Sequence, residues 1–129
     1  MPENAQDLTG VWNGLYSYAD GRSVTFVATL IEHGGTLSGG THEPCAFGRV
    51  RTLYATLTGR RQGNAVAFRK TYDAAVPGYH VVDYTGMLNA EATEIEGRWT
   101  IAGAWSGKFM MIRPNRAAAS AEHAVKARA

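Results

Sequence analysis

Two stretches near the C-terminal end decide the fold: EIEGRWTI at residues 94–101 and WSGKFMMIR at residues 105–113. In the first, apolar or glycine positions alternate with Glu94, Glu96 and Arg98, and in the second Lys108 lies opposite an apolar face. Alternation with a period of two is typical of a β-strand with one buried face. The predicted inward faces are Ile95, Gly97 and Trp99, and Gly107, Phe109 and Met111.

The same alternation recurs upstream, in segments rich in β-branched and aromatic residues. Short glycine-containing connections at 19–22, 33–35 and 60–63 separate several of them and favour hairpins between antiparallel neighbours. We expect about eight strands. The predicted strands are Gly10–Tyr18, Ser23–Glu32, Thr36–Thr41, Val50–Thr58, Ala65–Tyr72, Tyr79–Leu88, Glu94–Ile101 and Trp105–Arg113.

Successive hairpins without intervening helices predict an all-β fold. About eight such strands favour a closed antiparallel up-and-down barrel, because closure removes both exposed edges. We expect this barrel to span residues 9–113, after an N-terminal segment at 1–8. Residues 114–129 are Ala-rich with no apolar stripe, which predicts a helical or disordered tail.

Composition argues against several classes of protein. The formal charge is only +2, so the arginines between residues 49 and 69 indicate a solvated hairpin edge rather than a nucleic-acid surface. Cys45 is the single cysteine, so no intramolecular disulfide forms, and the opening residues lack a secretory pattern, which predicts a cytoplasmic protein. No apolar run reaches the roughly 18 residues that cross a bilayer, so we expect no membrane partner.

Gly10-Val-Trp12 at the first strand, Ile95–Trp99 and the closing strand ending in Arg113 resemble the calycins, which include lipocalins and avidins. The 95–113 region is most similar to avidin-like and lipocalin-like bacterial domains of uncharacterised function. The resemblance implies that Trp12 packs against Arg113 and closes one barrel end. A guanidinium over an indole gains cation–π energy, which agrees with a structural role for both residues. No specific ligand follows from the resemblance.

Motifs of common enzymes are absent from the sequence. It contains no Gly-x-Ser-x-Gly, Gly-x-Gly-x-x-Gly, P-loop, Cys-x-x-Cys or His-Glu-x-x-His pattern. A metal site at His42, Glu43 and Cys45 lacks a fourth ligand with suitable spacing. We therefore expect neither a metal nor a cofactor.

Strand parity places several polar side chains on inward faces. Lys70 aligns with Phe68 and Tyr72, and His80 aligns with Tyr84. A buried lysine needs an anion, for which Glu43 is the candidate, at the start of a loop over 43–49. A second long loop at 73–78 forms one rim with it if both lie at the same end.

Structural interpretations remain open for each of these residues. Lys70 can snorkel to the barrel mouth, Tyr72 and Tyr84 can be half-buried with hydroxyls at water, and His80 can be a hydrogen-bonded wall residue. Trp99 and Trp105 are expected mostly in the core, with Trp99 the better candidate for lining a cavity.

The leading functional hypothesis is binding of an amphipathic or apolar small molecule in the barrel lumen. One alternative is an enzyme of isomerase, cyclase or dehydratase type, with His80 and Tyr84 as acid–base groups and Lys70 lowering neighbouring pKa values. A further alternative is haem binding, with His80 as the axial ligand. Another is an interaction module whose barrel is filled by its own side chains. Val81 and Thr85 on the outer wall suggest a homodimer. The candidate ligand-binding residues are Glu43, Phe68, Lys70, Tyr72, His80, Tyr84, Trp99, Phe109 and Met111.

Overall fold

The computed structural model describes residues 7–44, 52–73, 81–102 and 105–114, which contain eight β-strands. Three expectations fall outside these residues: those for Cys45, for His80 and for the Ala-rich tail beyond Pro114. The strands are β1 (Gly10–Tyr18), β2 (Ser23–His33), β3 (Thr36–Pro44), β4 (Thr52–Gln62), β5 (Ala65–Tyr72), β6 (Val82–Leu88), β7 (Glu94–Ile101) and β8 (Trp105–Ile112).

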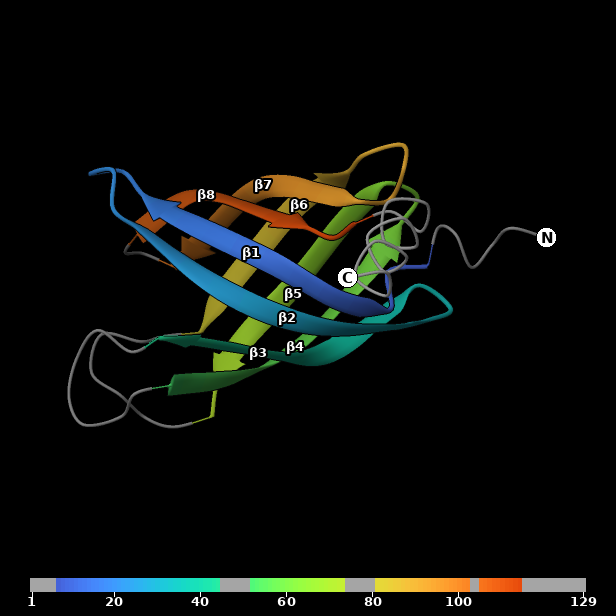
Figure 1. The fold of residues 1–129 in the computed structure, drawn as a ribbon, viewed down its shortest axis with the longest axis horizontal. Helices are drawn as coiled ribbons and strands as arrows, with labels where there is room; N and C mark the ends of the chain where they lie inside the picture. Colours follow the sequence, from blue (N-terminus) through green and yellow to red (C-terminus); the bar gives the residue numbers. More distant parts are fainter. Residues whose placement is uncertain (1–6, 45–51, 74–80, 103–104, 115–129) are drawn as a thin grey trace, which may run out of the picture.

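Each strand pairs antiparallel with the next one along the chain, and β8 pairs with β1 to close the sheet (Figure 1). Closure leaves no unpaired edge strand in the barrel. The prediction of an all-β, eight-stranded antiparallel up-and-down barrel is therefore confirmed. This architecture is compatible with a calycin-like fold. No helix within the described ranges is long and apolar enough to cross a membrane.

Two hairpins show how local sequence sets the strand register. Gly34 and Gly35 connect β2 to β3 with φ angles of 59° and 84°, a pair of positive values that glycine adopts without steric cost. Between β4 and β5 the predicted turn at 60–63 is wrong, because β4 continues to Gln62, which pairs with Ala65. Because the turn is shorter than predicted, Arg60 and Arg61 belong to β4 and pair with Ala67 and Val66 of β5.

The third strand is longer than predicted, and this changes the position of Glu43. Pairing of β3 with β4 continues past Thr41 to Pro44, which lies opposite Thr52. Glu43 is therefore a strand residue, and the prediction that it starts a loop is wrong. It lies two positions from Thr41 and shares its inward face, where it is buried. Pro44, opposite Thr52, is the last residue of β3 that the structure describes.

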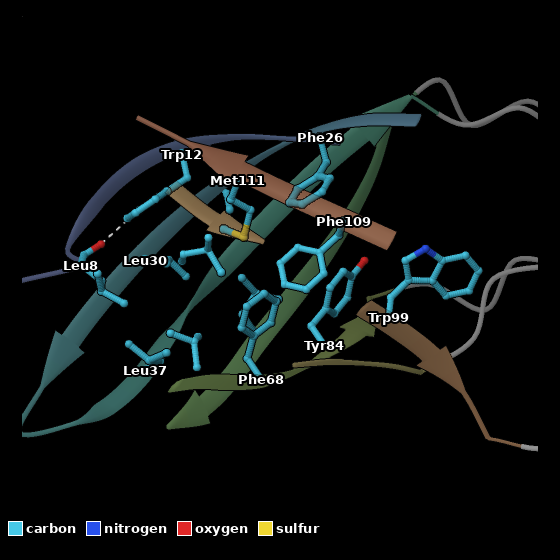
Figure 2. Close-up of a cluster of buried hydrophobic side chains, with 14 of the residues drawn as sticks. Leu8, Trp12, Phe26, Leu30, Leu37, Phe68, Tyr84, Trp99, Phe109 and Met111 are labelled. Atoms are coloured by element: carbon cyan, nitrogen blue, oxygen red, sulfur yellow. Dashed lines mark hydrogen bonds between the residues drawn. The ribbon is translucent and has the colours of Figure 1, made fainter. Parts of the chain in front are cut away.

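Side chains from all eight strands fill the barrel interior, and they include the predicted inward residues of β7 and β8. Figure 2 shows Phe68, Tyr84 and Phe109 in the middle of the buried cluster, with Trp12 toward one end and Trp99 toward the other. Phe26 fits against β1 only because residue 14 is glycine: a Cβ there would lie 2.2 Å from the Phe26 ring. Outward positions between them are mostly exposed, as the alternation requires.

One end of the barrel is sealed by the segment before β1 and the residue after β8. The Arg113 guanidinium lies 4.5 Å from the centre of the Trp12 ring, and it donates hydrogen bonds to the carbonyls of Asp7, Thr9 and Ala92. The Trp12 indole donates to the carbonyl of Leu8, which is fully buried. The expected contact between Trp12 and Arg113 is present, and the guanidinium also ties three chain segments together.

The opposite end is called the loop-bearing end here. β3 and β5 end there at Pro44 and Tyr72, and β4 and β6 begin there at Thr52 and Val82 (Figure 1). The connections 45–51 and 74–80 therefore both start and finish at this end of the barrel. The residues of both connections lie outside the described ranges, so the predicted rim stays a prediction.

Replacing Arg113 with lysine tests the seal. An ammonium has no planar fork to reach three carbonyls, so Arg113→Lys is expected to lower the free energy of unfolding by about 2 kcal/mol. Urea denaturation measures the loss. Arg69→Lys is the control, since Arg69 and Asp83 form an exposed pair and the change is expected to stay within about 0.5 kcal/mol. Equal losses in both variants would contradict the sealing role.

Candidate functional site

Four polar side chains from three regions of the chain meet inside the barrel near the loop-bearing end. The Glu43 carboxylate accepts hydrogen bonds from Lys70 Nζ at 2.7 Å, from the Tyr16 hydroxyl at 2.6 Å and from the Tyr72 hydroxyl at 2.8 Å. The side chains of Glu43 and Lys70 are 0% and 1% exposed. Glu43 is thus the counter-ion that the inward position of Lys70 requires.

Aromatic rings surround the rest of the Lys70 ammonium. Its Nζ lies 4.9 Å from the ring centres of Tyr16 and Tyr72, 5.1 Å from that of Phe26 and 5.5 Å from that of Tyr84. These distances are within the range of cation–π attraction. We call the four rings together with Glu43 the ammonium cage.

Burial shifts the protonation equilibria of the cage. Loss of water around the ammonium lowers the pKa of Lys70, and the adjacent carboxylate of Glu43 opposes this effect. Burial first, and then neighbouring phenols and Glu43, raise the pKa values of Tyr16 and Tyr72 above the ordinary range. Burial also raises the pKa of Tyr84. The three phenols are therefore held neutral.

Most predicted ligand-binding residues pack against one another. Phe68 stacks on Tyr84 with ring centres 4.9 Å apart, and Phe109 meets Tyr84 edge-on at 4.9 Å. Met111 is fully buried beside them, and Trp99, 2% exposed, donates its indole N–H to the carbonyl of Ser17. These side chains fill the interior together.

Three structural interpretations from the sequence are wrong. Tyr84 is buried rather than half-buried, because three aromatic side chains surround it. Tyr72 is half-buried, but its hydroxyl bonds to Glu43 instead of pointing to water. Lys70 does not snorkel, since the cage supplies both a carboxylate and π faces inside the barrel.

Other expectations concern residues that lie apart from the cage. His80 is outside the described residues, so its proposed acid–base and haem-ligand roles stay predictions. Within the described ranges, no group of three or more His, Cys, Asp or Glu side chains could hold a metal ion. Of the arginines between residues 49 and 69, Arg61 pairs with Glu32 and Arg69 pairs with Asp83.

The sequence does not predict a row of aromatic side chains that runs from the surface at the loop-bearing end to the ammonium cage. Trp105, expected mostly in the core, is 54% exposed although it shares the inward face of Gly107 and Phe109. Its ring meets Tyr18 edge-on at 6.1 Å, and Tyr18 in turn lies 5.9 Å from Tyr16 of the cage. Strand parity could have placed both residues inward, but only the barrel ends show which inward residue reaches solvent.

Half-buried apolar side chains lie at the loop-bearing end of the barrel, as Trp105 does. They are inward residues at strand ends of the loop-bearing end, and they pack against the core without being covered by it. We call them, with Trp105, the mouth residues: Tyr18, Val24, Tyr72 and Ile101.

The fold and the site define a closed eight-stranded antiparallel barrel, sealed at one end, with a buried ion pair in an aromatic cage beneath the other. Comparison with protein-family models gives no match, and comparison with curated protein sequences gives none either.

Breaking the buried pair is expected to be much more costly than breaking an exposed one. Lys70→Met leaves the Glu43 charge buried without its counter-ion, which costs about 3–5 kcal/mol. The double variant Lys70→Met/Glu43→Gln removes both charges and keeps an acceptor for the tyrosine hydroxyls, so it should recover most of that loss. Urea denaturation measures both.

The exposed pair supplies the control. Arg69→Met breaks the contact with Asp83 at the surface and is expected to cost less than about 1 kcal/mol. A double variant as unstable as Lys70→Met alone would show that the uncompensated charge is not the source of the loss.

Alkaline pH is expected to unfold the barrel through its buried phenols. Their folded pKa values lie above the unfolded value near 10, so their contribution to stability is complete below about pH 10 and is lost as the pH rises further. Phenolate absorbance should show that three of the six tyrosines ionise only with unfolding. Tyr16→Phe should reduce this late group by one. A smooth titration of all phenols before unfolding would contradict the cage geometry.

Proposed function

We propose that the protein binds a small amphipathic molecule at the loop-bearing end of the barrel. The mouth residues contact the apolar body of the ligand, and its polar group reaches toward Tyr16, Tyr72 and Glu43. A concave apolar site with a few convergent polar groups is the usual form of a small-molecule site.

The observation that carries this proposal is the position of Trp105. A large aromatic side chain on an inward strand face is expected to be covered, yet more than half of this one is open to solvent. The other inward tryptophans, Trp12 and Trp99, are buried. An exposed indole against Tyr18, which in turn lies against Tyr16 of the ammonium cage, offers a stacking surface for a flat ligand.

The proposal moves the ligand from the deep lumen to the mouth. Phe68, Tyr84, Phe109 and Met111 are closely packed and almost unexposed, so a ligand among them would have to displace them. Binding at the mouth needs no such displacement. The deep residues then support the site rather than contact the ligand.

The ammonium cage also limits which charge the inner end of the ligand can carry. Glu43 already neutralises Lys70, so a ligand anion is not required to compensate a buried cation. An anion would instead lie close to the Glu43 carboxylate at a desolvation cost. We therefore propose a ligand whose inner end is uncharged, such as a hydroxyl, amine or carbonyl group on an aromatic body.

The proposal also places the chain among the calycin-like barrels, as the sequence resemblance implied. The closed up-and-down topology and the stacking of Arg113 on Trp12 support this relationship.

A second candidate, a solid-core interaction module, is favoured by the close packing of the interior. Its outer wall carries exposed apolar side chains, including Met87 and Ile112.

Titration with 1-aminoanthracene, a neutral and flat fluorescent amphipath, tests mouth binding. The wild-type protein is expected to bind it saturably, with enhanced probe fluorescence. Trp105→Ala removes one aromatic contact worth about 0.5–1.5 kcal/mol, so the Kd should rise roughly three- to tenfold. Trp105→Phe should retain most of the affinity.

Tyr54→Ala is the matched control, because Tyr54 is an outward aromatic residue that is 60% exposed. Its removal should leave the Kd unchanged. No saturable binding by the wild-type protein, or equal effects of both alanine variants, would favour the interaction module over a mouth site.

A further inference from the structure

We infer that the ammonium cage is a recognition site for primary ammonium groups that the chain fills with its own Lys70, and that the cage would bind a short alkylammonium ion from solution once this side chain is removed. The inference concerns the interior of the barrel and does not depend on ligand binding at the mouth.

The cage has the chemistry that an ammonium ion requires. A carboxylate supplies a charge-assisted hydrogen bond at 2.7 Å, and four aromatic faces supply cation–π attraction on the remaining sides. The site excludes water almost completely, since Lys70 is 1% exposed. Cation–π attraction is stronger at desolvated sites than at exposed ones.

The ring positions are held by contacts that do not involve Lys70. Tyr84 stacks on Phe68, and Phe26 lies 6.1 Å from Tyr16 and 6.4 Å from Tyr84. These rings come from β1, β2, β5 and β6, so four strands of the wall fix them. A cage preorganised in this way loses little entropy when a cation binds.

The position of Glu43 is likewise held by contacts that do not involve Lys70, namely the hydrogen bonds from the Tyr16 and Tyr72 hydroxyls. Both donate to its carboxylate, so the anion stays in place when the lysine is absent. Lys70→Ala would therefore leave a cavity with one uncompensated negative charge and aromatic walls. A buried charge of this kind is unstable alone and favours an ion that neutralises it.

The removed atoms define the ligand. Lys70→Ala deletes Cγ, Cδ, Cε and Nζ, and n-propylammonium has the same heavy atoms in the same order. An ion of this size fits without repacking, whereas tetramethylammonium lacks an N–H donor for Glu43 and has a different shape. Neutral 1-propanol matches the size but not the charge.

The experiment refolds full-length Lys70→Ala with n-propylammonium chloride, and with sodium chloride or 1-propanol at equal concentration. We expect n-propylammonium to raise the Tm of the variant by about 5 °C or more at saturation, in a concentration-dependent manner. Sodium chloride should leave the Tm nearly unchanged, and 1-propanol should not raise it comparably. The wild-type protein should not respond, because its cage is occupied.

Lys70→Ala/Glu43→Gln is the matched control, since it keeps the cavity and removes its charge. Its response to n-propylammonium should fall to that of 1-propanol. Equal stabilisation of Lys70→Ala by the alcohol and the ammonium ion, or an undiminished response of the double variant, would overturn the inference.

A measurement on the wild-type protein covers the case in which Lys70→Ala does not fold. The ε-methylene protons of Lys70 should resonate upfield of those of the exposed Lys108, because four aromatic rings surround the ammonium. The Lys70 ammonium protons should also exchange slowly with water. Ordinary shifts and rapid exchange for Lys70 would overturn the inference, whatever the fate of the variant.

Discussion

The ion pair between Lys70 and Glu43 is the constraint around which this end of the barrel is arranged. Lys70 shares a strand face with Val66 and Phe68, so a register that buries those residues also buries the ammonium. An isolated buried charge is too costly, so a carboxylate has to reach the same point. Glu43 does so because β3 extends to Pro44, and two tyrosine hydroxyls donate further hydrogen bonds to its carboxylate.

The two ends of the barrel have different physical characters. At one end Arg113 donates to three backbone carbonyls and covers Trp12, which excludes solvent and connects both ends of the barrel sequence. At the other end the inward aromatic residues continue past the ion pair to Trp105, which is open to solvent. The sealed end contributes stability, and the proposed ligand site lies at the other, loop-bearing end.

Much of the site was accessible from strand parity, and the errors have specific causes. Parity placed Lys70 and Tyr84 inward, because alternation is a local property of the backbone. The sequence places Glu43 at the start of a loop, whereas pairing with β4 continues through His42, Glu43 and Pro44. Tyr16 shares the strand face of Trp12, but its hydrogen bond to Glu43, which lies 27 residues away in the sequence, does not follow from the alternation.

The sequence by itself determined the strand order, the inward faces of β5 to β8 and the need of Lys70 for an anion, because these follow from hydrophobic period, turn chemistry and the cost of burying charge. Tertiary structure alone decided how far each strand extends and which inward residues meet. Closure of β8 onto β1 sets the stagger of the whole sheet, and this stagger places Tyr16, Glu43, Lys70 and Tyr72 at one level. The same stagger covers Trp99 and leaves Trp105 at the mouth, a distinction that no local pattern contains.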